Sequence, residues 1–482
     1  MQFAVQTLVI LLPLVCGCLF ASWAFNPRRA LLDASVWGYG LVFGALFAAC
    51  SLRLLSALGQ PFATPGFLMV SCATVVVLLV LRRVSASESP GRSDAQTVGV
   101  GQPATVSRDT ILSTALVLLL LALSTLHFVL AAKETMLRPM FGWDATMHWA
   151  TKAKVWFDQG TLVPFVDNER WLELPGSEPV FTDHHAGYPA VVPLLQVWMG
   201  IAAGGWSESR VNSAWPLFML ALGLIVYGQG RLLGVARLPA AAFAYMVISL
   251  PMVGVQVALA GYADLPLAAC YTGAVLSLIS GHATGNGRHF VAALLLAFAG
   301  TQIKDEGFFW ALCLLPACFF VVFKVRTATL ANLAGLLVGV LVLWLFPRDW
   351  NVAGHSLESL RIAYVPDALS MIRQEYLSLG IWHLSLTVIP AAFLAVVLLH
   401  RKDELLLGYG ASIAAAILLY LFLFTWTRFS YGALQHSAAT RIALHLMPSM
   451  LAFAMLVWQR TMDRLGLPAP APSRAPVQGS SP

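Results

Sequence analysis

The chain has 482 residues, of which 59% are hydrophobic and 11% are charged, and its mean hydropathy is +0.76. A soluble domain carries about a quarter charged residues, so this composition excludes an ordinary soluble enzyme. One membrane crossing needs about 20 apolar residues, and the apolar content allows about a dozen crossings. The net charge is +6, but in a membrane protein the side on which the charges lie says more than their sum.

The apolar stretches predict an all-α polytopic membrane protein. The first stretch has no basic residue before it and an Arg pair after it, the reverse of a secretory signal, so we expect a retained helix with its N-terminus outside. The seven cysteines lie in apolar stretches and are expected to be small core residues. We predict thirteen transmembrane helices, at residues 2–25, 35–58, 65–81, 110–132, 211–229, 239–259, 265–281, 289–303, 307–323, 329–346, 382–400, 405–424 and 442–459.

Composition divides the chain into four parts. Residues 1–84 form three extra N-terminal transmembrane helices, and residues 85–109, rich in Ser, Gly, Pro and Gln, form a flexible cytoplasmic linker. Residues 110–460 form the main transmembrane module, in which 133–210 is a long outer loop with interfacial helices. Residues 461–482 form a disordered cytoplasmic tail.

One apolar segment in the long loop decides the topology. Residues 188–203 are short for a crossing and contain two prolines near their start. If this segment crossed the membrane, the later basic clusters would fall outside. The earlier basic clusters lie inside, so such a crossing would break the positive-inside rule. We therefore expect it to re-enter or to lie along the interface, which places the basic clusters inside and the acidic residues on the outer face.

The long outer loop opens with a group of polar residues. Asp144, His148 and Lys152 are spaced four apart, so on an α-helix they form one stripe that presents an acid, an imidazole and an ammonium. The alternative is the solvated face of an interfacial helix anchored by tryptophans.

Further polar groups fall at the outer ends of other predicted helices. Asp264 is a lone carboxylate at the mouth of a span, where an unpaired charge in hydrocarbon is costly. Lys304, Asp305 and Glu306 interrupt two apolar spans, although a plain external turn would look the same. Arg441 begins the last span, where it could snorkel to the interface or clamp a phosphate.

Two histidine-containing segments complete the outer-face group. Asp183, His184 and His185 precede the re-entrant segment, but adjacent side chains rarely reach one ion and no spaced ligand follows, so no metal site is expected. His436 lies just before the last span. Because so many polar features fall on one leaflet, we predict that they line one outer-face cavity suited to a substrate with a hydroxyl and an anionic group.

The order of these elements resembles the GT-C superfamily of polytopic glycosyltransferases, in particular protein O-mannosyltransferases and lipid A aminoarabinose transferases. The likeness covers about 110–459 and leaves the first three spans unmatched. It rests on Trp143-Asp144 at the start of a long outer loop, Tyr188-Pro189 later in it, Arg210 before the next span, Ala263-Asp264 between spans, the Lys304-Asp305-Glu306 turn, and Arg441 before a span that contains Pro448.

The resemblance implies an inverting glycosyltransferase that moves a sugar from a polyprenyl phosphate to a hydroxyl on the extracytoplasmic face. It implies that Asp144 is the general base and that Asp264 orients the acceptor, or a divalent cation if one is used. Lys152, Lys304 and Arg441 are the candidates for the donor phosphate. His148 departs from the family pattern and could orient Asp144 or protonate the leaving group. The remaining candidates, for substrate binding, are Asp305, Glu306, His185, Tyr188 and His436.

The acceptor implied is a glycan, lipid or protein in a cell envelope, and the location implied is a bacterial inner membrane with a periplasmic site. We expect the protein to be surrounded by membrane lipid, and we expect no nucleic-acid partner. The sequence alone leaves two alternative functions open. One is a proton-coupled transporter, and the other is a lipid-linked oligosaccharide ligase or polymerase. Transporters keep their charged residues near the membrane midplane, whereas these charges fall at span ends and in loops.

Overall fold

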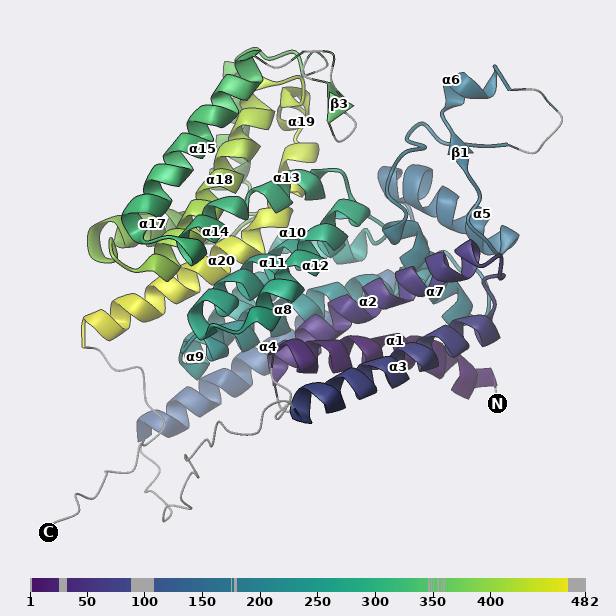
Figure 1. The fold of residues 1–482 in the computed structure, drawn as a ribbon, viewed down its shortest axis with the longest axis horizontal. Helices are drawn as coiled ribbons and strands as arrows, with labels where there is room; N and C mark the ends of the chain where they lie inside the picture. Colours follow the sequence, from purple (N-terminus) through teal and green to yellow (C-terminus); the bar gives the residue numbers. More distant parts are fainter. Residues whose placement is uncertain are drawn as a thin grey trace, which may run out of the picture.

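The computed structural model confirms a helical protein (Figure 1). It describes residues 2–25, 33–87, 108–174, 176, 180–345, 347, 349, 351–352, 355–356, 358 and 360–466. Two pairs of two-residue strands are the exceptions to the helical fold in this part of the chain. Strand β1 (Phe165–Val166) pairs in parallel with β2 (Phe181–Thr182), and β3 (Asn351–Val352) pairs antiparallel with β4 (His355–Ser356).

Nine of the helices in the described ranges are long and apolar enough to cross a membrane, as expected of an integral membrane protein. They are α1 (Gln2–Phe25), α2 (Ala34–Ala57), α3 (Thr64–Ser87), α4 (Arg108–Leu137), α8 (Ala214–Leu232), α11 (Asp264–Thr284), α15 (Val325–Leu345), α18 (Glu404–Trp426) and α20 (Ala438–Arg464). Helices α9 (Arg237–Ile248) and α10 (Pro251–Ala258) meet at 49° and make a tenth if they are one bent span.

Shorter helices lie where the other crossings were expected, so the number thirteen stays a prediction. These are α12 (Gly287–Ile303), α13 (Glu306–Leu312) with α14 (Leu315–Val322), and α17 (Ser385–Leu399). The predicted re-entrant segment contains α7 (Val191–Ala203), which spans about 20 Å at 1.5 Å per residue. That is shorter than a bilayer core, and residues 191–202 of this helix are buried in protein.

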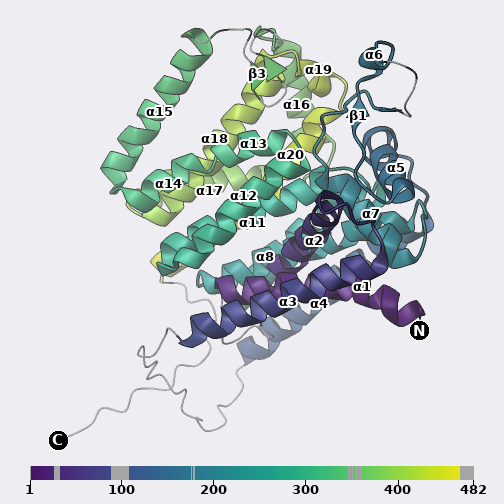
Figure 2. The same ribbon diagram turned by 45° about the vertical axis from the view of Figure 1, so that its right-hand side comes forward.

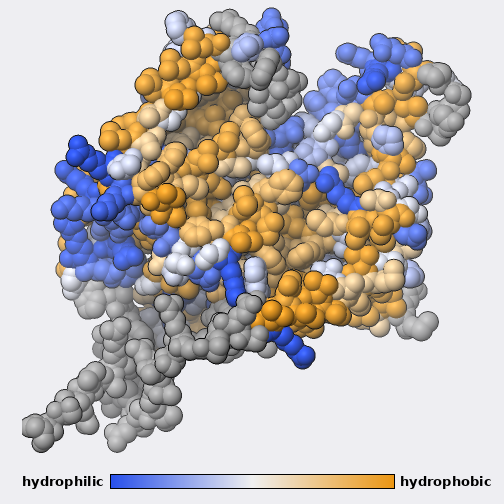
Figure 3. Space-filling view, in the orientation of Figure 1, coloured by the Kyte–Doolittle hydropathy of each residue, from blue (hydrophilic) through white to orange (hydrophobic). Residues whose placement is uncertain are grey.

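The helices give the molecule two distinct ends. Helix α5 (Thr151–Gln159), α6 (Asn168–Trp171) and strand β1 lie at one end, which we call the loop end (Figures 1 and 2). Helices α3 and α20 finish toward the opposite end. Figure 3 shows hydrophobic surface over the middle of the bundle and hydrophilic residues gathered toward the two ends, which is the pattern of a protein that spans a bilayer.

Helices α1 and α2 are packed into the main module and are not a separate unit. The Tyr39 hydroxyl of α2 donates to the Gly273 carbonyl of α11 at 3.0 Å, and the Trp198 indole of α7 donates to the Val9 carbonyl of α1 at 2.8 Å. Helix α3 packs on α1 and α2. The first two predicted extra helices therefore help to hold α7 and α11 in place.

The predicted linker and tail fall largely outside the described residues, at 88–107 and 467–482. Within the described part, α20 continues to Arg464, so the predicted tail boundary at residue 461 was too early by one helical turn. All seven cysteines are free thiols, and Cys16, Cys270 and Cys313 are buried, whereas Cys50 and Cys72 are exposed.

Candidate functional site

Four helix ends bring polar side chains together at the loop end of the bundle. Asp264 is the first residue of α11, Lys304 directly follows α12, and Glu306 is the first residue of α13. Arg441 lies in the first turn of α20. We call these four residues, with His445 and Asp144, the Asp264 cluster.

The Asp264 carboxylate is completely buried and accepts hydrogen bonds on both oxygens. Its Oδ1 accepts from Lys304 Nζ at 2.9 Å and from His445 Nε2 at 3.0 Å, and its Oδ2 accepts from Arg441 Nε at 2.9 Å. A buried charge is tolerated only when it is paired and hydrogen-bonded. Asp264 is therefore the anchor of the cluster, with its main acceptor positions occupied.

Arg441 connects this anchor to the long loop. Its Nη2 lies 2.7 Å from Asp144 Oδ2, while its Nε holds Asp264. The guanidinium also stacks 4.4 Å above the Tyr262 ring, which fixes its plane. The Asp144 side chain is one-third exposed, and its contact with Arg441 is through Oδ2.

The Asp144 backbone is set by the same tyrosine. A Cβ on Gly142 would overlap the Tyr262 ring, so glycine is required for this approach. The Tyr262 carbonyl in turn accepts from the buried Trp215 indole of α8 at 2.8 Å. Sequence reasoning missed Tyr262. Its position two residues before Asp264 could have identified it as a site residue.

Lys304 is held by two carboxylates, Asp264 and Glu306, the latter at 3.0 Å. Burial disfavours the charged ammonium, but the two carboxylates outweigh it and raise the pKa of Lys304 above its ordinary value. The tight turn that carries it depends on Gly307, where a Cβ would overlap the Gly300 carbonyl oxygen. Lys304 is thus a permanently charged cation at the helix ends.

The predicted stripe of Asp144, His148 and Lys152 is wrong, because the backbone over Ala145–Ala150 is a π-helix. A π-turn holds more residues than an α-turn, so residues four apart no longer line up. Asp144 turns to Arg441, whereas His148 and Lys152 both turn to Asp183. Such π-turns occur frequently at functional sites.

We call the second group, which is made of His148, Lys152, Asp183, His185 and Tyr188, the Asp183 cluster. The Asp183 Oδ1 lies 3.0 Å from His148 Nδ1 and accepts from the His185 backbone N–H at 2.7 Å. Lys152 Nζ lies 3.5 Å from Asp183 Oδ2 and donates to the His185 carbonyl. Burial lowers the pKa of Lys152, and the charge of Asp183 offsets this only in part.

A stack of rings completes the Asp183 cluster. The Tyr188 ring is stacked between His185, with centroids 4.5 Å apart, and the buried Trp149, at 5.0 Å. Burial raises the pKa of Tyr188 to about 12, and the charges of Lys304, Glu306, Asp144 and Asp305 also act on it. Because charges of the Asp264 cluster act on the hydroxyl of Tyr188, which belongs to the Asp183 cluster, the two clusters are neighbours.

Two further predicted residues lie differently. Asp305 lies in sequence between Lys304 and Glu306 of the Asp264 cluster, and its charge acts on Lys152 and Tyr188 of the Asp183 cluster. His436 pairs through Nδ1 with Glu375 of α16 (Pro366–Ser378) at 3.0 Å, and Glu375 is completely buried. The structure therefore gives His436 a partner outside both clusters, and its predicted role in substrate binding rests on the sequence alone.

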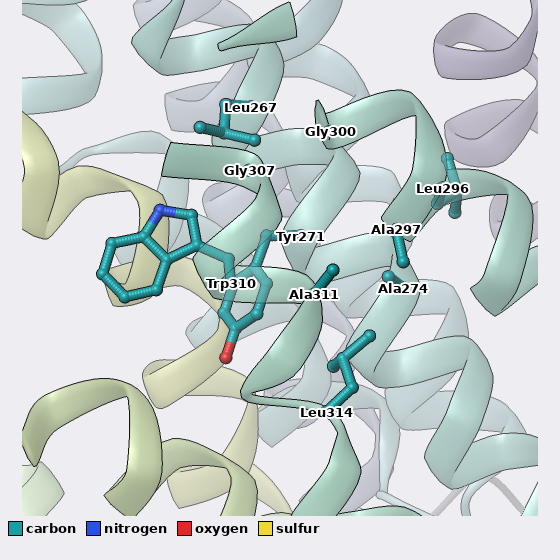
Figure 4. A pocket seen from close by; sticks show the side chains of 10 residues that line it. All are labelled: Leu267, Tyr271, Ala274, Leu296, Ala297, Gly300, Gly307, Trp310, Ala311 and Leu314. Atoms are coloured by element: carbon teal, nitrogen blue, oxygen red, sulfur yellow. The ribbon is translucent and has the colours of Figure 1, made fainter. Parts of the chain in front are cut away.

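An apolar hollow lies between α11, α12 and α13 (Figure 4). Its walls include Leu267, Gly300, Gly307 and the ring of Trp310. The Trp310 indole N–H donates to His445 Nδ1 at 3.0 Å, so this apolar wall contacts the Asp264 cluster directly. A low-dielectric wall strengthens the ion pairs beside it. Sequence reasoning missed Trp310 and His445, although His445 lies one turn after Arg441.

The described residues include no group of three or more His, Cys, Asp or Glu side chains arranged to hold a metal ion. Comparison of the whole chain with protein-family models, with curated proteins and with solved structures gave no match.

Proposed function

We propose that the protein is an inverting glycosyltransferase that moves a sugar from a polyprenyl phosphate to a hydroxyl acceptor at the loop end of the bundle. The observation that carries this proposal is Arg441, which holds a buried carboxylate, Asp264, and a partly exposed one, Asp144. One guanidinium thereby positions a buried anchor and a partly exposed carboxylate side by side. Lys304 adds a second cation on the same anchor.

Charge balance suggests how the donor enters. Two cations, Lys304 and Arg441, face three carboxylates, Asp144, Asp264 and Glu306, so the resting cluster has no spare positive charge. A phosphate must displace a carboxylate, and Asp144 is the most exposed of the three. Phosphate binding to Arg441 would free Asp144 for the acceptor hydroxyl.

With donor and acceptor bound, the sugar moves in a single displacement. The acceptor hydroxyl gives its proton to Asp144, and its oxygen forms a bond to the anomeric carbon as the bond from that carbon to the phosphate oxygen breaks. The polyprenyl phosphate leaves with the electron pair, and Lys304 and Arg441 stabilise the charge that grows on it. Attack opposite the leaving group inverts the anomeric carbon.

This arrangement changes the role expected for Asp264. Its two oxygens already accept from Lys304, His445 and Arg441, so we assign it the task of holding the two cations and not of orienting the acceptor. The Asp183 cluster, with its ring stack and a lysine of lowered pKa, suits the neutral, hydroxyl-rich acceptor.

The positions of the charges argue against a proton-coupled transporter. Transporters bind substrate and proton near the bilayer midplane in broken helices. Here Asp264 and Glu306 are the first residues of their helices, and Lys304 directly follows one. Charges at helix ends suit a reaction at the membrane surface.

The test uses purified protein in nanodiscs with a panel of radiolabelled undecaprenyl-phosphate monosaccharides and with cell-envelope extract as acceptor. The proposal predicts label transfer by the natural protein and loss of transfer in Asp144→Asn. Transfer from lipid-linked oligosaccharides only would favour a ligase or polymerase. Movement of the sugar across a vesicle membrane without covalent change would favour a transporter, and either outcome contradicts the proposal.

A further inference from the structure

The hydrogen bonds around His445 determine which of its nitrogens carries the proton. An indole N–H can only donate, so the Trp310 bond at 3.0 Å requires a bare Nδ1 on His445. The proton therefore lies on Nε2, which donates to Asp264 Oδ1 at 3.0 Å. Both His445 and Trp310 are almost completely buried. The imidazole is neutral, in a single tautomer, as long as the indole stays in place.

Neutrality matters because His445 shares its acceptor atom. Lys304 Nζ donates to the same oxygen, Asp264 Oδ1, at 2.9 Å. Two cations on one carboxylate oxygen repel each other, whereas an ammonium and a neutral imidazole do not. Protonation of His445 would therefore displace Lys304 from the cluster.

The groups around His445 act on its protonation in both directions. Burial opposes a protonated imidazole, as does Lys304 at the end of α12, whereas Asp264 of α11 and Glu306 of α13 favour it. On its own helix, Arg441 precedes it by one turn. Helix α18, which also packs on α20, contributes the Tyr409 and Tyr420 hydroxyls, which bond to Ser449 and Ala439. The Trp310 N–H is the group that occupies Nδ1.

We propose that His445 is a positioning residue, kept neutral by Trp310, that fixes Asp264 and thereby keeps Lys304 at the anion-binding site in acidic as well as neutral surroundings. The geometry that supports the proposal is the chain of buried bonds from Trp310 through His445 to Asp264. Its functional part rests on the proposed role of Lys304 in holding a phosphate. The protonation state itself is independent of that role.

The first experiment measures the protonation state without any ligand. Solid-state NMR of the full-length protein in bilayers, with ¹⁵N-labelled histidine, is compared with His445→Gln to identify the His445 signals. We expect a bare Nδ1 and a protonated Nε2 throughout about pH 5 to 8, the range in which histidine ordinarily changes charge. A protonated Nδ1 within that range would overturn the proposal.

The second experiment measures binding of undecaprenyl phosphate to nanodisc-embedded protein across the same range. In Trp310→Phe, His445 can take a second proton, so binding relative to the natural protein should weaken as pH falls, by about 10-fold or more if one charge-assisted hydrogen bond is lost. In Trp310→Phe with His445→Gln, a neutral amide replaces the imidazole, and the extra pH dependence should disappear. A ratio that stays constant in Trp310→Phe, or a pH dependence that survives in the double variant, contradicts the positioning role.

The two proposals fail in different ways. If the natural protein binds no undecaprenyl phosphate at any pH, the proposed function fails, while the NMR signals still decide the state of His445. If Trp310→Phe does not fold, the NMR measurement on the natural protein alone decides the neutrality of His445.

Discussion

Two buried aspartates at the loop end, Asp264 and Asp183, are each paired with a lysine and a histidine, yet they hold these partners differently. Asp264 accepts hydrogen bonds from three side chains on both oxygens, and the pKa of its lysine, Lys304, is raised. No hydrogen bond from the described residues reaches Asp183 Oδ2, and the pKa of its lysine, Lys152, is lowered.

The difference follows from the elements that carry the two clusters. Asp264 lies where helices end, and the helices deliver two cations to it at hydrogen-bonding distance. Asp183 lies in a loop, where Lys152 stands 3.5 Å away and bonds a backbone carbonyl. The same residue types therefore raise the pKa of the lysine in one place and lower it in the other, because burial and the closeness of the carboxylates decide the balance.

The largest effect expected on transfer is that of Asp144→Asn, which keeps the shape of the residue but removes the base. Transfer should fall by about 10²- to 10⁴-fold, the usual contribution of a general base. The Tm should stay close to that of the natural protein, because Asp144 is partly exposed. Near-normal transfer would remove Asp144 from the reaction and leave only the anchor half of the Asp264 cluster.

Asp264→Asn should instead act on stability. It leaves Lys304, Arg441 and the buried His445 without the charge of an acceptor that is itself completely buried, and breaking such a pair costs about 3–5 kcal/mol. Thermal unfolding in detergent should show a clear fall in Tm. The matched control is Asp158→Asn, which breaks the exposed pair with Lys154 and should cost about 0–1 kcal/mol. Equal Tm values for the two variants would show that Asp264 is not an anchor.

Arg441→Lys tests the bridge between anchor and base. Lysine keeps the charge but cannot bond two carboxylates through separate nitrogens while stacked on Tyr262. We expect the KM for a polyprenyl-phosphate donor to rise by about 10- to 100-fold, the value of one or two charge-assisted bonds. Unchanged donor kinetics would take Arg441 out of the phosphate site.

Lys152→Met tests the lowered pKa in the Asp183 cluster. Because the folded-state pKa lies below 10.5, the unfolded chain binds more protons between the two values, and stability from this group rises as pH increases toward 10.5. The substitution should remove that rise. The measurement is Tm against pH, with Lys154→Met as the control. A slope unchanged by Lys152→Met would mean that burial does not perturb the lysine.

The smallest effect on transfer is expected from His436→Ala, because His436 pairs with Glu375 and with neither cluster. The donor KM should change by no more than about twofold, as for a site remote from function. The Tm should fall, because a buried carboxylate loses its partner. A large rise in KM with an unchanged Tm would restore His436 to the substrate site predicted from sequence.

Sequence reasoning located the helices and the polar residues at one end of them, because hydropathy and charge placement follow from the bilayer itself. It also anticipated that Asp144, Asp264, Lys304 and Arg441 would be close together, which the ion pairs bear out. What these residues do remains a proposal.

The rest required coordinates for specific reasons. The spacing of residues does not reveal a π-turn, so the sequence could not show that Asp144 and His148 pair with different residues. Tyr262, Trp310 and His445 lie in apolar or weakly polar stretches, where a buried hydrogen bond looks like core packing. Asp183 is followed in sequence by two histidines, but the helical side chains that pair with it lie more than thirty residues earlier in the chain.

The most direct test is a cryo-EM structure of the protein in nanodiscs with undecaprenyl phosphate bound. The account predicts phosphate density between Lys304 and Arg441, with the bond from Arg441 to Asp144 broken and the bond to Asp264 kept. A phosphate bound elsewhere, with Arg441 still paired to Asp144, would contradict it.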